Sequence, residues 1–196
     1  MGCYEGWTCI LNVYLNDILS QHESGWLGCW MTLSGCIGSV IVGYWMDRFQ
    51  GRLKSTAFGL LAGSFLAFLT FCINIDSRYG WESTTVTYLC GILGGLMFNS
   101  SIPLFLEMIM ETIFGWGNET IGSMLFTMIN TLIQILFLVI PTEINGSTLW
   151  MAWLNCCSMV AGCLVLYFCK VQYKRLEFDQ YTKTSSQCEK YLTGSA

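Results

Sequence analysis

Residues 43–54 read Gly-Tyr-Trp-Met-Asp-Arg-Phe-Gln-Gly-Arg-Leu-Lys, and this short charged segment decides how the rest of the chain is interpreted. It holds one acidic and three basic residues. The segments on both sides of it are apolar and reach the length of about 20 residues that a membrane-spanning helix requires. A short, positively charged turn between two such segments is typical of the cytoplasmic connections in helical membrane proteins.

The composition of the whole chain agrees with a lipid environment. Of its 196 residues, 54% are hydrophobic and only 11% are charged, whereas soluble domains carry about 25% charged residues. The mean hydropathy is +0.52. The net charge of −4 provides no basic surface for nucleic acid. Most of the eleven cysteines lie inside apolar runs, and with a single histidine they predict neither a metal site nor a cofactor.

The hydropathy pattern predicts an all-α membrane protein with six transmembrane helices. A weaker first segment covers residues 1–19 and looks like a helix whose first turns are missing. Five full spans are expected at 25–46, 55–75, 84–110, 120–141 and 148–169. Residues 1–172 should therefore form one helical bundle, and residues 173–196 should form a cytoplasmic tail.

The distribution of basic residues predicts the orientation in the membrane. With six spans, the connections 47–54 and 111–119 and the tail from residue 170 lie on one side. That side carries all the lysines and arginines except Arg78. Because cytoplasmic loops are enriched in lysine and arginine, this side is expected to be the cytoplasmic one.

The charged turn is also a candidate gate. Asp47 can face the positive N-terminal end of a neighbouring helix, and Arg48 and Arg52 can pair with carboxylates. Such a cluster can stabilise one conformation and separate in another. The alternative is an ordinary positively charged loop without a gating role.

The segment 99–112 holds the second group of candidate residues. Pro103 inside a span leaves a backbone carbonyl without its helical partner and favours a kink. Glu107 and Glu111 share one helix face, close to that of Asn99 and Pro103. Carboxylates within a span mark a pathway, a proton relay or a gate. Two roles stay open: pairing of Glu111 and Glu107 with Arg48 or Arg52, or proton coupling by Glu107.

Other polar and aromatic residues within the spans are candidates for a substrate or proton pathway. Tyr4 or Trp7 could stack on a flat ligand, and Asn130 and Gln134 share a face of the fifth span. Hydrogen bonding between helices is an equally good explanation for the amides. The candidates for the pathway are Tyr4, Trp7, Asn12, Asn99, Pro103, Glu107, Asn130 and Gln134.

These motifs together resemble solute carrier family 49 of the major facilitator superfamily. The resemblance covers about residues 2–180 and rests on Gly25-Trp26-Leu27-Gly28, Asp47-Arg48-Phe49, Asn99-Ser100-Ser101-Ile102-Pro103 with Glu107 and Glu111, and Tyr173-Lys174-Arg175-Leu176. It implies the C-terminal half of a twelve-helix fold, with a central substrate site between two halves. The implied partners are the lipid bilayer, a small organic solute, protons and an N-terminal half of six helices.

The resemblance also implies a function. It points to proton-coupled export of a pyridoxine-like solute across the lysosomal membrane, with the plasma membrane as the second location. Choline or heme-related substrates of the same family are alternatives. The chain departs from the family pattern at Glu5, where a small neutral residue is expected. A truncated membrane protein that regulates a partner is a further possibility, while the lack of a nucleophile–base spacing argues against an enzyme.

Overall fold

The computed structural model describes residues 1–11, 15, 19–48, 52–75, 83–113, 119–139, 149–169 and 181. Within these residues every regular element is an α-helix: α1 (Gly2–Cys9), α3 (Gln21–Arg48), α4 (Leu53–Ile75), α5 (Thr84–Ile113), α6 (Glu119–Val139) and α7 (Leu149–Phe168). Five of them, α3 to α7, are long and apolar enough to cross a membrane. The expected all-α membrane fold is therefore confirmed, and each of the five full spans corresponds to one of these helices.

The first expected span is described as a shorter helix. The helix α1 ends at Cys9, so it falls short of the length needed to span a bilayer. Beyond it, the amide of Leu15 donates to the carbonyl of Leu11 at 2.9 Å, and that of Leu19 donates to the carbonyl of Leu15 at 2.8 Å. Both bonds have the four-residue spacing of an α-helix.

Side-chain caps explain two of the helix boundaries. The amide and hydroxyl of Ser20 donate to the Glu23 carboxylate at 3.0 and 2.9 Å, and the Glu23 amide donates to the Ser20 hydroxyl at 3.3 Å. This capping box starts α3 four residues before the apolar run begins. The Asn74 side chain, at the end of α4, donates to the Ser83 carbonyl at 3.0 Å and to the Thr87 hydroxyl at 2.7 Å. It thus links the end of α4 to the start of α5.

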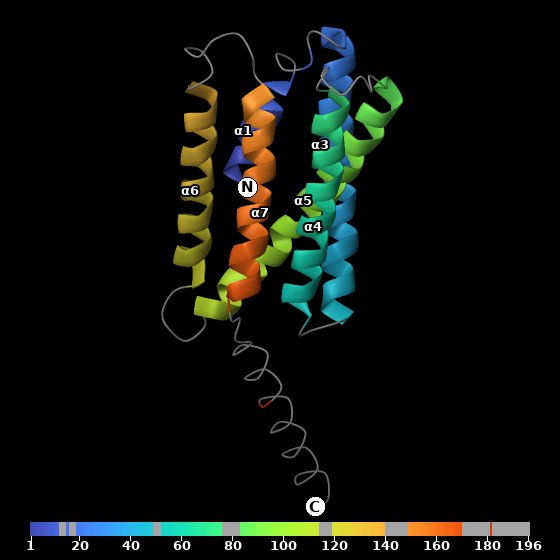
Figure 1. The fold of residues 1–196 in the computed structure, drawn as a ribbon. Helices are drawn as coiled ribbons and strands as arrows, with labels where there is room; N and C mark the ends of the chain where they lie inside the picture. Colours follow the sequence, from blue (N-terminus) through green and yellow to red (C-terminus); the bar gives the residue numbers. More distant parts are fainter. Residues whose placement is uncertain are drawn as a thin grey trace, which may run out of the picture.

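The helices run side by side in a bundle that α5 crosses obliquely (Figure 1). The helices α3 and α4 both pack against α5, while α1 packs against α6 and α7. Contacts of α4 with α7 and of α5 with α6 connect these two groups. The C-terminal ends of α3, α5 and α7 lie at the same end of the bundle as the N-terminal ends of α4 and α6 (Figure 1).

A lysine at this end links α4 to α7. The Lys54 ammonium group donates to the carbonyl oxygens of Tyr167 and Cys169 at 3.1 and 2.6 Å. The last carbonyl groups of a helix lack partners within the helix and carry partial negative charge. Lys54 therefore stabilises the C-terminal end of α7.

Small residues allow α1 to approach α6 closely. A Cβ atom on Gly6 would lie only 2.5 Å from the Cβ of Phe137, and one on Gly2 would lie 2.8 Å from the Cβ of Ile133. The two glycines are four residues apart and form a G-x-x-x-G pattern, a frequent arrangement where membrane helices pack. Gly2 and Gly6 therefore permit the short α1 to pack directly on α6.

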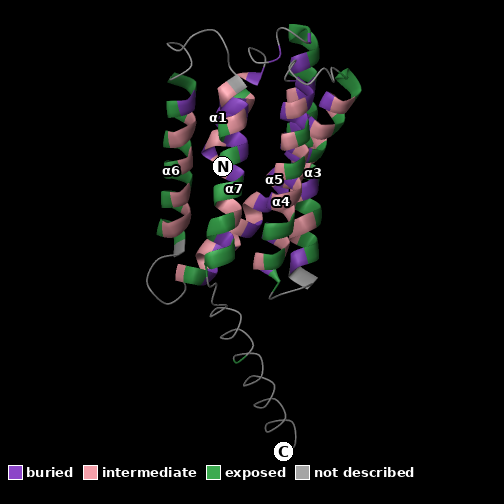
Figure 2. Cartoon of the chain, viewed as in Figure 1, coloured by how far each residue is buried: buried purple, intermediate pink, exposed green. Residues whose placement is uncertain are grey.

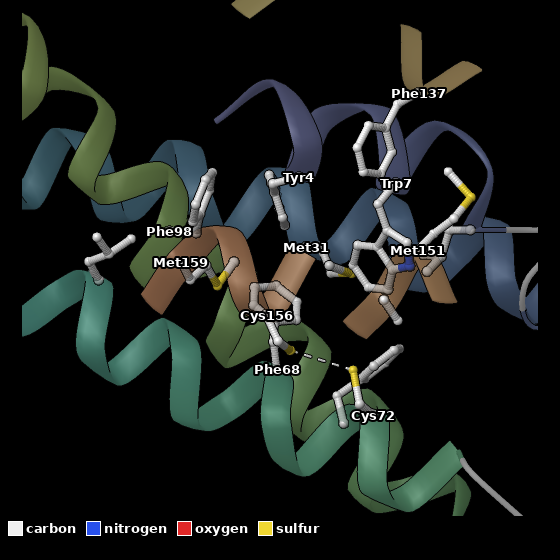
Figure 3. Packing of buried hydrophobic residues seen from close by; sticks show 14 of the residues in the cluster. Tyr4, Trp7, Met31, Phe68, Cys72, Phe98, Phe137, Met151, Cys156 and Met159 are labelled. Carbon is white, nitrogen blue, oxygen red and sulfur yellow. Dashed lines mark hydrogen bonds between the residues drawn. The ribbon is translucent and has the colours of Figure 1, made fainter. Parts of the chain in front are cut away.

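Aromatic rings fill the centre of the bundle, and apolar side chains cover its outside. Trp7 stands edge-on to Phe68 and Phe71, with ring centroids 5.6 and 5.5 Å apart. Figure 3 shows Trp7 near Met31 and Met151, which belong to α3 and α7. Most residues of α6 are exposed (Figure 2), and apolar side chains such as those of Met128 and Leu132 project outward from it. Such a surface is suited to contact with lipid.

Candidate functional site

A cleft of about 540 Å³ lies between α1, α3 and α5. It is placed close to the middle of the long helices, because Cys36 and Asn99 are near the midpoints of α3 and α5. Its lining combines aromatic, hydroxyl, amide and carboxylate groups with aliphatic side chains: Tyr4, Glu5, Thr8, Thr32, Cys36, Ser39, Val40, Asn99, Ile102, Pro103 and Leu106. Clefts of this size and mixed character are typical of small-molecule sites.

Pro103 and Asn99 of α5 lie in one wall of the cleft. Pro103 has no N–H group, so the carbonyl of Asn99, four residues earlier, loses its partner within the helix. The Ser39 hydroxyl of α3 lies 3.0 Å from this carbonyl oxygen and 2.8 Å from the carbonyl oxygen of Gly35. Its single proton is shared between these two acceptors. Ser39 thus supplies from α3 the hydrogen bond that Pro103 removes from α5.

The side chain of Asn99 is held between α3 and α1. A Cβ atom on Gly35 would overlap with Asn99, lying 2.6 Å from its Cβ. The Asn99 side chain is also close enough to Tyr4 to form a hydrogen bond with its hydroxyl group. The Tyr4 ring packs on Phe98, with ring centroids 4.2 Å apart. A glycine on α3 and a tyrosine on α1 therefore together position the amide group at the cleft.

Of the predicted pathway residues, Tyr4, Asn99 and Pro103 are brought together in this cleft. Trp7 lies elsewhere: it is 1% exposed and belongs to the aromatic core, as Figure 3 shows. Trp7 lies in the core because α1 is rotated so that this residue faces the neighbouring helices. The polarity pattern of the sequence alone does not determine that rotation. Asn12 lies outside the described residues.

The two amides of α6 form bonds between helices. The side-chain Oδ1 of Asn130 accepts a hydrogen bond from the backbone amide of Gly2 at 2.9 Å, and its Nδ2 donates to the backbone carbonyl of Phe126 at 2.7 Å. The Gln134 amide group lies 3.6 Å from the Cys9 sulfur atom. The contacts with Gly2 and Cys9 are of the kind expected from the alternative explanation for both residues, which is hydrogen bonding between helices.

The predicted gate residues lie at the shared end of α3 and α5. Glu111 is buried, with 5% of its surface exposed, and Glu107 is half-buried. Arg52 is exposed just before α4. The side chains of Asp47 and Arg48 lie outside the described part of the chain, so their pairing with the two glutamates stays a prediction.

Sequence reasoning missed four polar residues of the cleft wall, namely Thr8, Thr32, Cys36 and Ser39. Small hydroxyl and thiol side chains inside an apolar run give no distinct pattern. One signal for Ser39 was available: the carbonyl left unpaired by Pro103 requires a donor, and a hydroxyl on a neighbouring helix is an obvious source.

Comparisons with known proteins identify relatives of this chain among membrane transport proteins. No family model matches the chain. It is 30% identical to the solute carrier family 49 member 4 homolog of Xenopus laevis and 28% identical to that of Xenopus tropicalis, in each case over 92% of this chain and 40% of the relative. It is 23% identical to the choline/ethanolamine transporter flvcr2b of Danio rerio, over 84% of this chain and 34% of the relative. The chain thus spans about 40% of the length of the first two relatives.

The fold and the relatives together define a class: the chain is a helical membrane protein with the fold of half a major facilitator. Within that class, the chain is similar to members of solute carrier family 49. The resemblance inferred from the sequence motifs is therefore confirmed.

Proposed function

We propose that this chain is the C-terminal six-helix half of a secondary transporter and that the cleft between α1, α3 and α5 is its share of the substrate site. The observation that carries the proposal is the convergence of Tyr4, Asn99 and Pro103 from two helices on one cleft near mid-membrane depth. Transporters of this architecture bind their substrates near the bilayer midplane, at the interface of structural repeats, where helices are interrupted. The helix α5 is continuous, but at this depth Pro103 leaves the Asn99 carbonyl to accept a hydrogen bond from Ser39 of α3.

The proposed substrate is a small organic solute. A pyridoxine-like compound exported from lysosomes is the first candidate, and the name of the Danio rerio relative supports choline or ethanolamine as the second. Heme-related solutes are the third. The cleft volume of about 540 Å³ accommodates compounds of the first two kinds, because small-molecule pockets generally have about 300–1,000 Å³.

The proposed coupling ion is the proton, and Glu107 is the proposed carrier. Glu107 follows Pro103 by four residues on α5, so it continues the helix face that lines the cleft toward the shared end of α3 and α5. Glu111, one turn further, is proposed to pair with Arg48 or Arg52, with Asp47 completing the gate. Opening of this gate would release solute on the cytoplasmic side.

The test uses the gene product that contains this chain together with any preceding six-span half, expressed in cells. Uptake or efflux of labelled pyridoxine and choline is measured across lysosomal and plasma membranes. Asn99→Ala is expected to abolish transport, and a Leu132→Ala control on the outer face of α6 is expected to keep it. Full activity of the Asn99→Ala variant would overturn the site assignment.

A second measurement tests coupling. Glu107→Gln removes a protonatable group while keeping size and hydrogen-bonding capacity, so transport is expected to lose its dependence on the proton gradient. An unchanged dependence on pH would exclude Glu107 as the carrier. If the gene product transports none of the solutes and instead alters a partner's transport, the regulatory alternative replaces this proposal.

A further inference from the structure

The wall of the cleft contains one charged side chain. Glu5 is half-buried on α1 and is the only carboxylate or basic side chain among the described residues that line the cleft. Charged side chains at membrane depth are costly and generally face a bundle interior or a water-filled pathway. A carboxylate that borders an open cleft is therefore placed where it can act on a solute.

The hydroxyl groups around Glu5 increase the negative character of the wall. Thr8 donates its proton to the backbone carbonyl of Glu5 at 2.9 Å, and Thr32 donates to that of Gly28 at 3.0 Å. Ser39 donates to Gly35 and Asn99 carbonyls, as described above. Since each hydroxyl has one proton, all three oxygens are left with lone pairs that can only accept hydrogen bonds.

We propose that Glu5 makes this cleft selective for positively charged solutes over anionic ones and is its specificity-determining residue. The carboxylate supplies the charge, and the hydroxyl oxygens supply acceptors for the N–H groups of an ammonium. This inference rests on the proposed function, because it assigns a charge preference to the same cleft.

The cleft also contains a built-in probe of its own charge. Cys36 is an exposed thiol that lines the cleft, while Cys169 is an exposed thiol at the end of α7, away from the cleft. Both react with alkyl methanethiosulfonates: the cysteine sulfur forms a disulfide with the alkylthio group, and methanesulfinate leaves. The reaction rates of a trimethylammonium-ethyl and a sulfonato-ethyl reagent therefore compare a cation with an anion at the same sulfur atom.

The experiment measures both rates at Cys36 by peptide mass spectrometry on the purified chain. In Glu5→Gln, the ratio of cation to anion rates at Cys36 is expected to fall about tenfold, the lower range of focusing by a charged cleft. The ratio at Cys169 is expected to stay the same, and the rate with uncharged methyl methanethiosulfonate reports access. Glu5→Asp retains the charge and is expected to retain the preference.

The outcomes separate this inference from the proposed function. An unchanged ratio at Cys36 in Glu5→Gln, with unchanged access, overturns the role of Glu5 even if the protein transports a solute. A reduced ratio in a protein that fails every transport assay supports Glu5 and overturns the proposed function alone.

Discussion

The hydrogen bond between Ser39 and the Asn99 carbonyl predicts an energetic coupling between Ser39 and Pro103. The Ser39 hydroxyl lies 3.0 Å from this carbonyl, which Pro103 leaves without a helical partner. In Ser39→Ala the carbonyl loses its donor. An unsatisfied buried group costs about 1–3 kcal/mol, but Asn99 borders an open cleft that water can enter. Hydrogen bonds between membrane helices also average only about 0.6 kcal/mol. We therefore expect Ser39→Ala to lower the free energy of unfolding by about 1 kcal/mol.

The same substitution should have almost no effect once Pro103 is replaced. In Pro103→Ala, the new N–H group of residue 103 can donate to the Asn99 carbonyl within α5. A double-mutant cycle of the two substitutions is therefore expected to give a coupling of about 1 kcal/mol, which corresponds to roughly a fivefold change in the folding equilibrium.

The assay is reversible unfolding of the four proteins in mixed micelles of mild detergent and dodecyl sulfate, followed by tryptophan fluorescence. Ser34→Ala is the matched control, because Ser34 also bridges α3 and α5, donating to the Ile92 carbonyl at 3.3 Å. No proline follows Ile92 by four residues, so Ser34 should show no coupling with Pro103. A coupling below about 0.3 kcal/mol for Ser39, within the error of additivity, would refute the reasoning.

Two further substitutions test how α1 and α7 are held. Gly6→Ala places a methyl group 2.5 Å from the Phe137 Cβ and should destabilise the protein by about 1–3 kcal/mol, measured by the detergent melting temperature. Gly59→Ala, with open space around it, should be neutral or stabilising, and equal effects at both sites would contradict close packing of α1 on α6. Lys54→Met removes two bonds to the end of α7, so amide exchange in the last turn of α7 should become faster, by about fivefold for a loss of 1 kcal/mol. Lys54→Arg should exchange as slowly as the original, and fast exchange in both variants would show that the cation is not what holds this end.

The positions of the five long helices follow from the sequence because hydropathy alone determines them. An apolar run of sufficient length must form a helix in lipid, where backbone groups have no water to bind. The helices α4 and α6 accordingly begin and end within two residues of the predicted bounds. The boundary of α3 differs more because the capping box of Ser20 and Glu23 extends the helix beyond the apolar run.

The candidate site was only partly predictable. Pro103 and Asn99 stood out as a helix-breaking residue and an amide in an apolar span. The roles of Trp7 and Asn130 depend on which face of α1 meets which neighbour. Trp7 is enclosed by Phe68 and Phe71, and Asn130 binds the Gly2 amide. Neither contact is encoded in local polarity.

The sequence by itself determined that this chain is a membrane protein and which residues form its long helices. It also determined that one carbonyl group of α5 requires a hydrogen-bond donor from another helix. These properties depend on local composition and on the covalent structure of proline. Only the tertiary structure decided that Ser39 is the donor and that Glu5 shares a cleft with Asn99. Such pairings depend on how helices rotate and pack, and that is set by contacts between residues far apart in the chain, such as Gly35 with Asn99.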